Sequence, residues 1–216
     1  MKFTLAMALV LTAGISFAQA SERELSAEEV TADVAEMKAL NGMDDSINNT
    51  RINWVPANSA GKIVIKVHLI SASNPKEHLE VFRQETANPD SLTPMNIFDN
   101  GASNTALVSS ANGAKFRNCG KSKNSPCITP TGNFNIDLME VMHHSSRFQN
   151  APMPWSMFFL GSVGIAIHGA TPSEYKDLGK KASHGCIRIH PDNGHLLYNL
   201  IKSEGGTRSG AVVQIH

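Results

Sequence analysis

Beyond residue 60, short apolar runs rich in β-branched residues alternate with clusters of Asn, Pro, Ser and Gly. This pattern is typical of a mainly β domain. Within 62–70, Ile63, Ile65 and Val67 alternate with polar positions, which predicts a strand that turns one face inward. Further strands are predicted at 78–84, 105–110, 134–139 and 211–215.

Two segments carry helical periodicity instead. The first is 26–41, which opens with a capping-box pattern and has an apolar face formed by Val30, Val34, Met37 and Leu40. It could dock on the β domain or act as a spacer. The second is 191–201, where a start signal precedes the apolar face of Leu196, Leu197, Leu200 and Ile201.

The first twenty residues form an apolar segment with one early lysine and the small-residue ending Ala18-Gln19-Ala20. We interpret 1–20 as a secretory signal peptide cleaved before Ser21. The alternative is a membrane anchor, but the run is short of the roughly 20 apolar residues that a spanning helix needs. The predicted organisation is therefore a signal peptide (1–20), a helical extension and linker (21–60), and one domain (61–216).

The charge balance bears on the binding partners of the chain, and its cysteines bear on disulfide formation. The chain has 19 basic and 19 acidic residues, so nothing indicates a nucleic-acid partner. In an exported chain, cysteines tend to oxidise in pairs. Cys119 and Cys127 flank a short polar stretch and are predicted to form a disulfide, which leaves Cys186 free. The alternative is three unpaired thiols.

Candidate chemistry lies near the C-terminal end, in the stretch Ser183-His184-Gly185-Cys186. A cysteine is a strong nucleophile as the thiolate, and a neighbouring imidazole can take its proton and hold the resulting ion pair. His168-Gly169 closes a predicted strand upstream and offers that imidazole. The alternative is an inert buried cysteine beside a glycine turn.

His168, fourteen intervening residues and then Ser183-His184-Gly185-Cys186 resemble the signature of the L,D-transpeptidase (YkuD-type) catalytic domain. The segments 129–134 and 153–159 are similar to segments that precede the first histidine in that family. The resemblance spans roughly 62–216. Arg188 stands where some members carry Asn, so substrate contacts at that position remain open.

The resemblance implies a mainly β fold, a β-sandwich with the catalytic cysteine on a loop near the C-terminal end. It implies an exported, cell-wall-facing cysteine acyltransferase that acts on peptidoglycan stem peptides, needs no cofactor and is acylated by carbapenems. Cys186 would be the nucleophile and His168 the general base, with the Gly169 carbonyl orienting the second ring nitrogen. We also expect an acceptor groove, for which 88–104 and 148–159 are candidate walls.

We expect the residues around the nucleophile to support catalysis. Backbone N–H groups of His184, Gly185 and Cys186 would hold the oxyanion. Ser183 and the His184 side chain would shape the loop, and Arg188 would either meet a substrate carboxylate or brace the site. The adjacent His143 and His144 could contact substrate, although a solvated loop is the plainer interpretation of that pair.

Two alternatives come from other classes of protein. His168, His184, Cys186 and His190 are all zinc-ligand types, but the paired-ligand spacing is absent, so no metal is predicted. A binding module that has lost catalysis is disfavoured because Cys186 and His168 are both present.

Several wall reactions could share one acyl-enzyme: cross-linking, hydrolysis, D-amino acid exchange and attachment of a protein to the wall. The sequence gives neither the organism nor the oligomeric state.

Overall fold

The structure, a computed structural model, describes residues 61–117, 119 and 124–216. Its strands are β1 (Lys62–His68), β2 (His78–Gln84), β3 (Leu92–Pro94), β4 (Thr105–Ala111), β5 (Gly132–Asn135), β6 (Leu138–Ser145), β7 (Ala151–Leu160), β8 (Ile165–Gly169), β9 (Lys181–Ser183), β10 (Ile187–Ile189) and β11 (Val212–Ile215). The α-helix is α2 (Pro191–Ser203), and the 3₁₀ turns are η2 (Asp99–Gly101), η3 (Gly161–Val163), η4 (Pro172–Asp177) and η5 (Gly206–Arg208).

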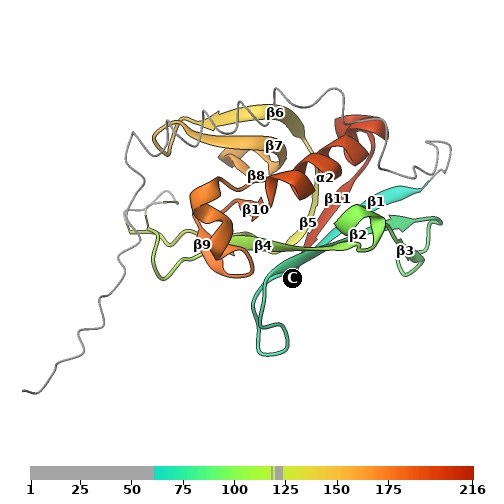
Figure 1. Cartoon of the computed structure of the whole chain (residues 1–216), viewed down its shortest axis with the longest axis horizontal. Helices are drawn as coiled ribbons and strands as arrows, with labels where there is room; N and C mark the ends of the chain where they lie inside the picture. The colour runs from blue at the N-terminus through green and yellow to red at the C-terminus, as the bar shows by residue number, and fades with distance from the viewer. Residues whose placement is uncertain (1–60, 118, 120–123) are drawn as a thin grey trace, which may run out of the picture.

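The strands form one sheet in the order β5-β11-β1-β2-β4-β10-β8-β7-β6, with β3 beside β2 and β9 beside β4. In Figure 1, β6, β7 and β8 lie on one side of α2, and β4, β2 and β1 lie on the other. The sheet therefore curls around its own core, and α2 packs on β7 and β8. The mainly β prediction is confirmed.

The core is built from the inward positions of the alternating strands. On β1, Ile63, Ile65 and Val67 are all buried, as their alternation predicts. The same cluster includes buried residues from β4, β7, β8, β10 and α2: Val108, Met157, Ile167, Ile187, Leu197 and Ile201. The strand carrying His168 and the one that follows Cys186 are thus anchored in the same core.

The run 134–139 was predicted to form one strand, but it is divided between two. It supplies the end of β5, which pairs with β11, and the start of β6, which pairs with β7. The chain crosses between these distant strands at Ile136 and Asp137, where Ile136 is buried and the Asp137 carboxylate accepts the Gly161 N–H at 2.9 Å. Side-chain pattern alone did not reveal that the run serves two edges of the sheet.

The predicted signal peptide and the predicted helix at 26–41 lie outside the described residues. Within the described residues, no helix is both long and apolar enough to cross a membrane.

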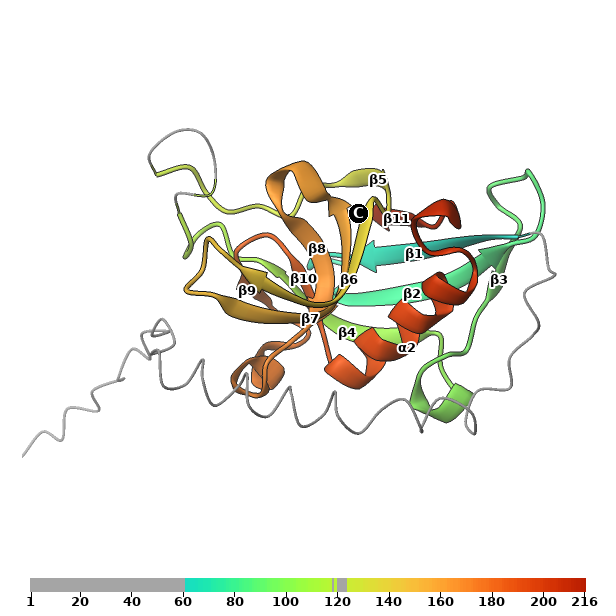
Figure 2. The ribbon, with the colours of Figure 1, turned by 90° about the horizontal axis from the view of Figure 1, so that it is seen from above.

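Parallel pairing of β8 and β10 creates the setting for the site. Ile167 pairs with Ile187 and His168 pairs with Arg188, while β4 flanks β10 on its other side. The labels of β8 and β10 are close together in Figure 2. Residues 20 positions apart in the chain are thereby held one strand spacing apart.

Candidate active site

Cys186 directly precedes β10, so its position follows from the β8–β10 register. Ile187 pairs with Ile167, so Cys186 and Ala166 come directly before the two paired residues. Cys186 packs against the cluster formed by Met153, Phe158 and Ala166. Because alternate residues of a strand share a face, Ala166 and His168 point to the same side of β8. The thiol and the imidazole therefore face the same side of the sheet.

His168 is buried, and its ring has a fixed orientation. Nδ1 lies 2.8 Å from the carbonyl oxygen of Gly169. A carbonyl oxygen can only accept a hydrogen bond, so Nδ1 carries the proton and donates it. Nε2 then keeps its lone pair. Burial, aided by the positive charge of Arg188, lowers the pKa of His168 to about 4, so the ring is a neutral base at pH 7.

The Cys186 thiol lies 3.5 Å from the carbonyl oxygen of Gly164, to which it donates. Burial raises its pKa, and the Ala166 N–H and the Arg188 charge only partly oppose that shift. A raised thiol pKa beside a lowered imidazole pKa favours the neutral pair. These two shifts oppose the thiolate–imidazolium ion pair that the sequence suggests, so we expect the proton to move as the thiol attacks.

The loop before Cys186 is closed by Ser183. Its hydroxyl donates to the Cys186 carbonyl at 2.6 Å and accepts the Gly185 N–H at 3.1 Å. Gly185 has φ of 141° and a Cβ there would meet the Ile128 carbonyl oxygen at 3.3 Å, so glycine is required. The Gly185 N–H, which was predicted to hold an oxyanion, is thus already engaged by Ser183.

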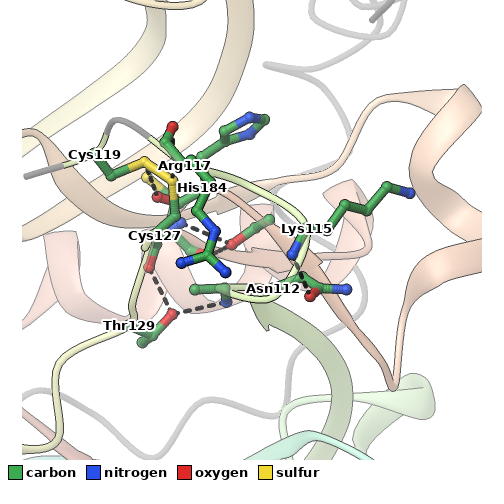
Figure 3. The surroundings of a disulfide bond; sticks show 11 residues. Asn112, Lys115, Arg117, Cys119, Cys127, Thr129 and His184 are labelled. Carbon is green, nitrogen blue, oxygen red and sulfur yellow. Dashed lines mark hydrogen bonds between the residues drawn. A yellow bond between two sulfur atoms is a disulfide. The ribbon is translucent and has the colours of Figure 1, made fainter. Parts of the chain in front are cut away.

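A disulfide between Cys119 and Cys127 lies against this loop, as Figure 3 shows. Cys119 Sγ is 3.5 Å from the His184 carbonyl oxygen. Thr129 follows Cys127 by two residues. Its hydroxyl donates to the Gly185 carbonyl at 2.8 Å and accepts the Ala111 N–H at 3.0 Å. The disulfide-bonded segment thus supports the backbone on which the thiol is mounted.

His184 has a different environment from His168. Its ring stacks on Phe116 with centroids 3.8 Å apart and makes a tilted contact with Phe148 with centroids 4.4 Å apart. Burial, followed by the charge of Arg188, lowers the pKa of His184 to about 4. These two contacts fix the ring on the loop, and the loop-shaping role of His184 stays a prediction.

Arg188 is bound within the protein on both sides of its guanidinium. One nitrogen is 2.9 Å from Glu174 Oε1, and the other donates to the Ala182 carbonyl at 3.0 Å. Glu174 Oε2 accepts the Thr171 N–H at 2.9 Å, which fixes the carboxylate at the start of η4. Of the two roles left open for Arg188, the geometry favours bracing.

The family model for the L,D-transpeptidase catalytic domain (YkuD) matches residues 92–215. The chain belongs to this family. No curated protein matches it.

Solved structures of L,D-transpeptidases resemble the chain at low identity. One from Mycobacterium smegmatis is 13% identical with a TM-score of 0.47, over 72% of this chain and 59% of that chain. One from Xylanimonas cellulosilytica is 20% identical with a TM-score of 0.46, over 74% and 62%. L,D-transpeptidase 3 from Mycobacterium tuberculosis, in complex with a faropenem-derived adduct, is 18% identical with a TM-score of 0.47, over 72% and 60%. The chain spans about six tenths of their length, and the family assignment rests on the family model.

The structure corrects two expectations about the surroundings of the site in this L,D-transpeptidase domain. His143 and His144 lie in β6, not in a solvated loop, and His143 Nδ1 is 2.7 Å from Glu140 Oε2. The segment 88–104 contains β3, which lies at the opposite end of the long axis from β9 in both views (Figures 1 and 2). It is therefore not a wall of a groove at Cys186, whereas Phe148 of the segment 148–159 contacts His184.

The zinc alternative is not supported by the geometry. Among the described residues, His168, His184, Cys186 and His190 do not bring their ligand atoms together as a metal-binding group. His190 instead packs its ring on Tyr175, with centroids 4.7 Å apart.

Sequence analysis missed several residues that support the L,D-transpeptidase site. Glu174 could have been found, because Thr171-Pro172-Ser173-Glu174 is a capping-box sequence directly after the predicted base. Thr129 was noted only as part of a turn. The stacking of Phe116 on His184 had no signal, since 68 residues separate them and no periodicity connects them.

Proposed function

We propose that this L,D-transpeptidase family member cross-links peptidoglycan stem peptides through an acyl-enzyme on Cys186. His168 Nε2 takes the thiol proton as sulfur attacks the carbonyl of the third residue of a tetrapeptide stem. Collapse of the tetrahedral intermediate breaks the bond to the terminal D-alanine, whose amine receives that proton. An acceptor amine then attacks the thioester, giving up a proton through His168, and the thiol is restored.

The observation that carries the proposal is the orientation of His168. Its Nδ1–H bond to the Gly169 carbonyl leaves Nε2 as an unprotonated base. His168 lies on the same face of β8 as Ala166, which belongs to the cluster that Cys186 packs against. A neutral buried imidazole beside a neutral thiol suits proton transfer during attack, and such general-base catalysis contributes roughly a hundredfold to ten-thousandfold.

Charge that develops on the attacked oxygen needs donors fixed in place. With the Gly185 N–H engaged by Ser183, we assign this role to the N–H groups of His184 and Cys186. Both belong to the backbone that Thr129 and the disulfide support. The loop therefore keeps these donors aligned without needing to rearrange during the reaction.

Transfer to an amine instead of water requires a positioned acceptor, since fixing two reactants removes much of the entropic barrier to their meeting. The segment 148–159 supplies one wall, because Phe148 contacts His184 and both Met153 and Phe158 pack against Cys186. A stem-peptide substrate belongs to the cell wall, so the proposal includes export directed by residues 1–20.

The same thiol and oxyanion donors would accept a carbapenem, whose strained lactam presents a reactive carbonyl. We propose that the ring opens on Cys186 and leaves a covalent thioester. The proton from sulfur passes to the lactam nitrogen through His168.

The test is incubation of the purified protein with a disaccharide-tetrapeptide, with products followed by mass spectrometry. Cross-linked dimer and released D-alanine are expected from the wild type, and neither from Cys186→Ala. If only tripeptide and D-alanine accumulate over a range of acceptor concentrations, the protein is an L,D-carboxypeptidase. If the product is a tetrapeptide with a new terminal D-amino acid, it is an exchange enzyme. Turnover by Cys186→Ala would refute the assigned nucleophile.

A further inference from the structure

A second group of polar side chains lies on β1 and β2, separated from β10 by β4. His68, His78 and Glu80 each offer one ligand atom, and these three atoms lie within 4.8 Å of one another. None of them belongs to the site around Cys186. All three are half-buried, so the group is partly shielded but open to solvent.

The strand register explains why the three side chains meet. His68 pairs with His78 across the antiparallel β1–β2 ladder, and Glu80 is two residues further along β2. Residues directly opposite, and those two apart on one strand, share a face of the sheet. The two imidazole rings stack with centroids 4.6 Å apart, and His68 Nε2 is 3.0 Å from Glu80 Oε2.

The ring of His78 is oriented by its own backbone neighbour. Nδ1 lies 3.1 Å from the Lys76 carbonyl oxygen, which can only accept, so Nδ1 carries the proton. Nε2 is then the nitrogen with a free lone pair. Metal-binding histidines almost always donate their second ring N–H to a carbonyl or carboxylate in this way.

The C-terminal residue adds a third imidazole at the same corner. His216 donates its backbone N–H to the Val67 carbonyl, and its own carbonyl accepts the Leu69 N–H, both at 3.0 Å. Its ring centroid is 5.9 Å from that of His68. Figure 1 shows the C-terminus beside the hairpin that joins β1 to β2.

We propose that His68, His78 and Glu80 bind a zinc ion, with a water molecule or His216 as the fourth ligand. Two imidazole nitrogens and a carboxylate oxygen are a known zinc ligand set, and Zn²⁺ binds each at about 2.0 to 2.2 Å. That bond length places ligand atoms roughly 3 to 4 Å apart, so rotation of the side chains closes the remaining gap.

One further feature agrees with a cation at this position. Lys66, which stands opposite Glu80 in the β1–β2 ladder, places its ammonium over the Phe82 ring, 5.2 Å from the ring centroid. The ion would connect β1, β2 and, through His216, the end of β11, so its role is to stabilise the fold and not to take part in acyl transfer.

The test uses the full chain without a histidine tag, in a Cys186→Ser background so that the free thiol cannot bind zinc. After treatment with a chelator, the protein is titrated with zinc chloride by isothermal titration calorimetry. We expect one equivalent to bind and to raise Tm. His78→Gln and Glu80→Gln should each weaken binding at least about tenfold, the loss typical of disrupting a metal site. His143→Gln, which changes a histidine in β6, is the matched control and should bind as the parent does.

Two results would overturn the proposal. One is the absence of bound zinc up to millimolar concentration. The other is zinc binding that His78→Gln and Glu80→Gln leave unchanged, because the ion would then lie elsewhere. Neither result bears on acyl transfer, which is measured separately with Cys186 intact.

Discussion

Two histidines flank the candidate nucleophile, and in both the pKa is lowered to about 4 by burial and the charge of Arg188. Their surroundings nevertheless differ. His168 is at the end of a core strand, with Nδ1 bound to a carbonyl and Nε2 left as a base. His184 is on a loop, with its ring in contact with two phenyl rings. A low pKa alone therefore does not distinguish the proposed base from the second histidine, whereas the hydrogen bond of His168 Nδ1 does.

The largest expected effect comes from removing the oriented histidine. His168→Ala should lower kcat/KM roughly a hundredfold to ten-thousandfold, because no other group takes the thiol proton. In the wild type, the ring is protonated below its pKa of about 4 and can no longer accept a proton, so kcat/KM should fall as pH drops through that value. The pH–rate profile of His168→Ala should lack this acid limb, and a retained limb would contradict the assignment.

A smaller effect is expected from Glu174→Gln. The Glu174 carboxylate raises the pKa of His168, so its removal lowers that pKa further and moves the acid limb to lower pH. Arg188 also loses its partner. We expect kcat/KM to fall about tenfold, equivalent to about 1.4 kcal/mol.

The matched control for this prediction is Glu140→Gln, which removes a carboxylate that pairs with His143 instead. Its pH profile should match the wild type. An equal fall in both variants with no shift of the acid limb would show that Glu174 does not act through His168.

The Cys119–Cys127 disulfide supports the loop that carries His184. The double variant Cys119→Ser/Cys127→Ser should lose about 2 to 3 kcal/mol of unfolding free energy, the usual value for a short disulfide loop. It should lower kcat/KM less than about fivefold, since Thr129 still holds the Gly185 carbonyl. Urea denaturation and steady-state kinetics measure the two effects. An unchanged unfolding free energy would argue against a bridge in the folded protein.

The smallest effect on turnover is expected from His184→Leu, because leucine can still pack against Phe116 and Phe148. We expect kcat/KM to change less than about fivefold, or about 1 kcal/mol. A loss as large as that of His168→Ala would reassign the base to His184.

Stability against pH provides a second measure of the same variant. The pKa of His184 is lower in the folded chain than in the unfolded one, so stability present above pH 6.5 is lost as pH falls toward 4. His184→Leu removes this contribution. Its Tm should therefore drop less than that of the wild type between pH 6.5 and 4.

Sequence reasoning predicted the parts of the site that depend on local order. The alternation of apolar and polar residues predicted β1, and the spacing of His168 and Cys186 predicted the family. Both signals can be recognised within a short stretch of sequence. It failed where distant segments meet. The run 134–139 serves two sheet edges, and Phe116 reaches His184 only through the fold. The engaged Gly185 N–H likewise depends on a Ser183 rotamer that no sequence pattern encodes.

The most direct test of the account is to locate the acyl group. Purified protein is mixed with a tetrapeptide donor without acceptor, quenched in acid, and analysed by intact-mass spectrometry and peptide mapping. The account predicts an adduct equal to the donor minus D-alanine, carried by the peptide that contains Cys186, and no adduct on Cys186→Ala. An adduct on another residue, or one that also forms on Cys186→Ala, would contradict it.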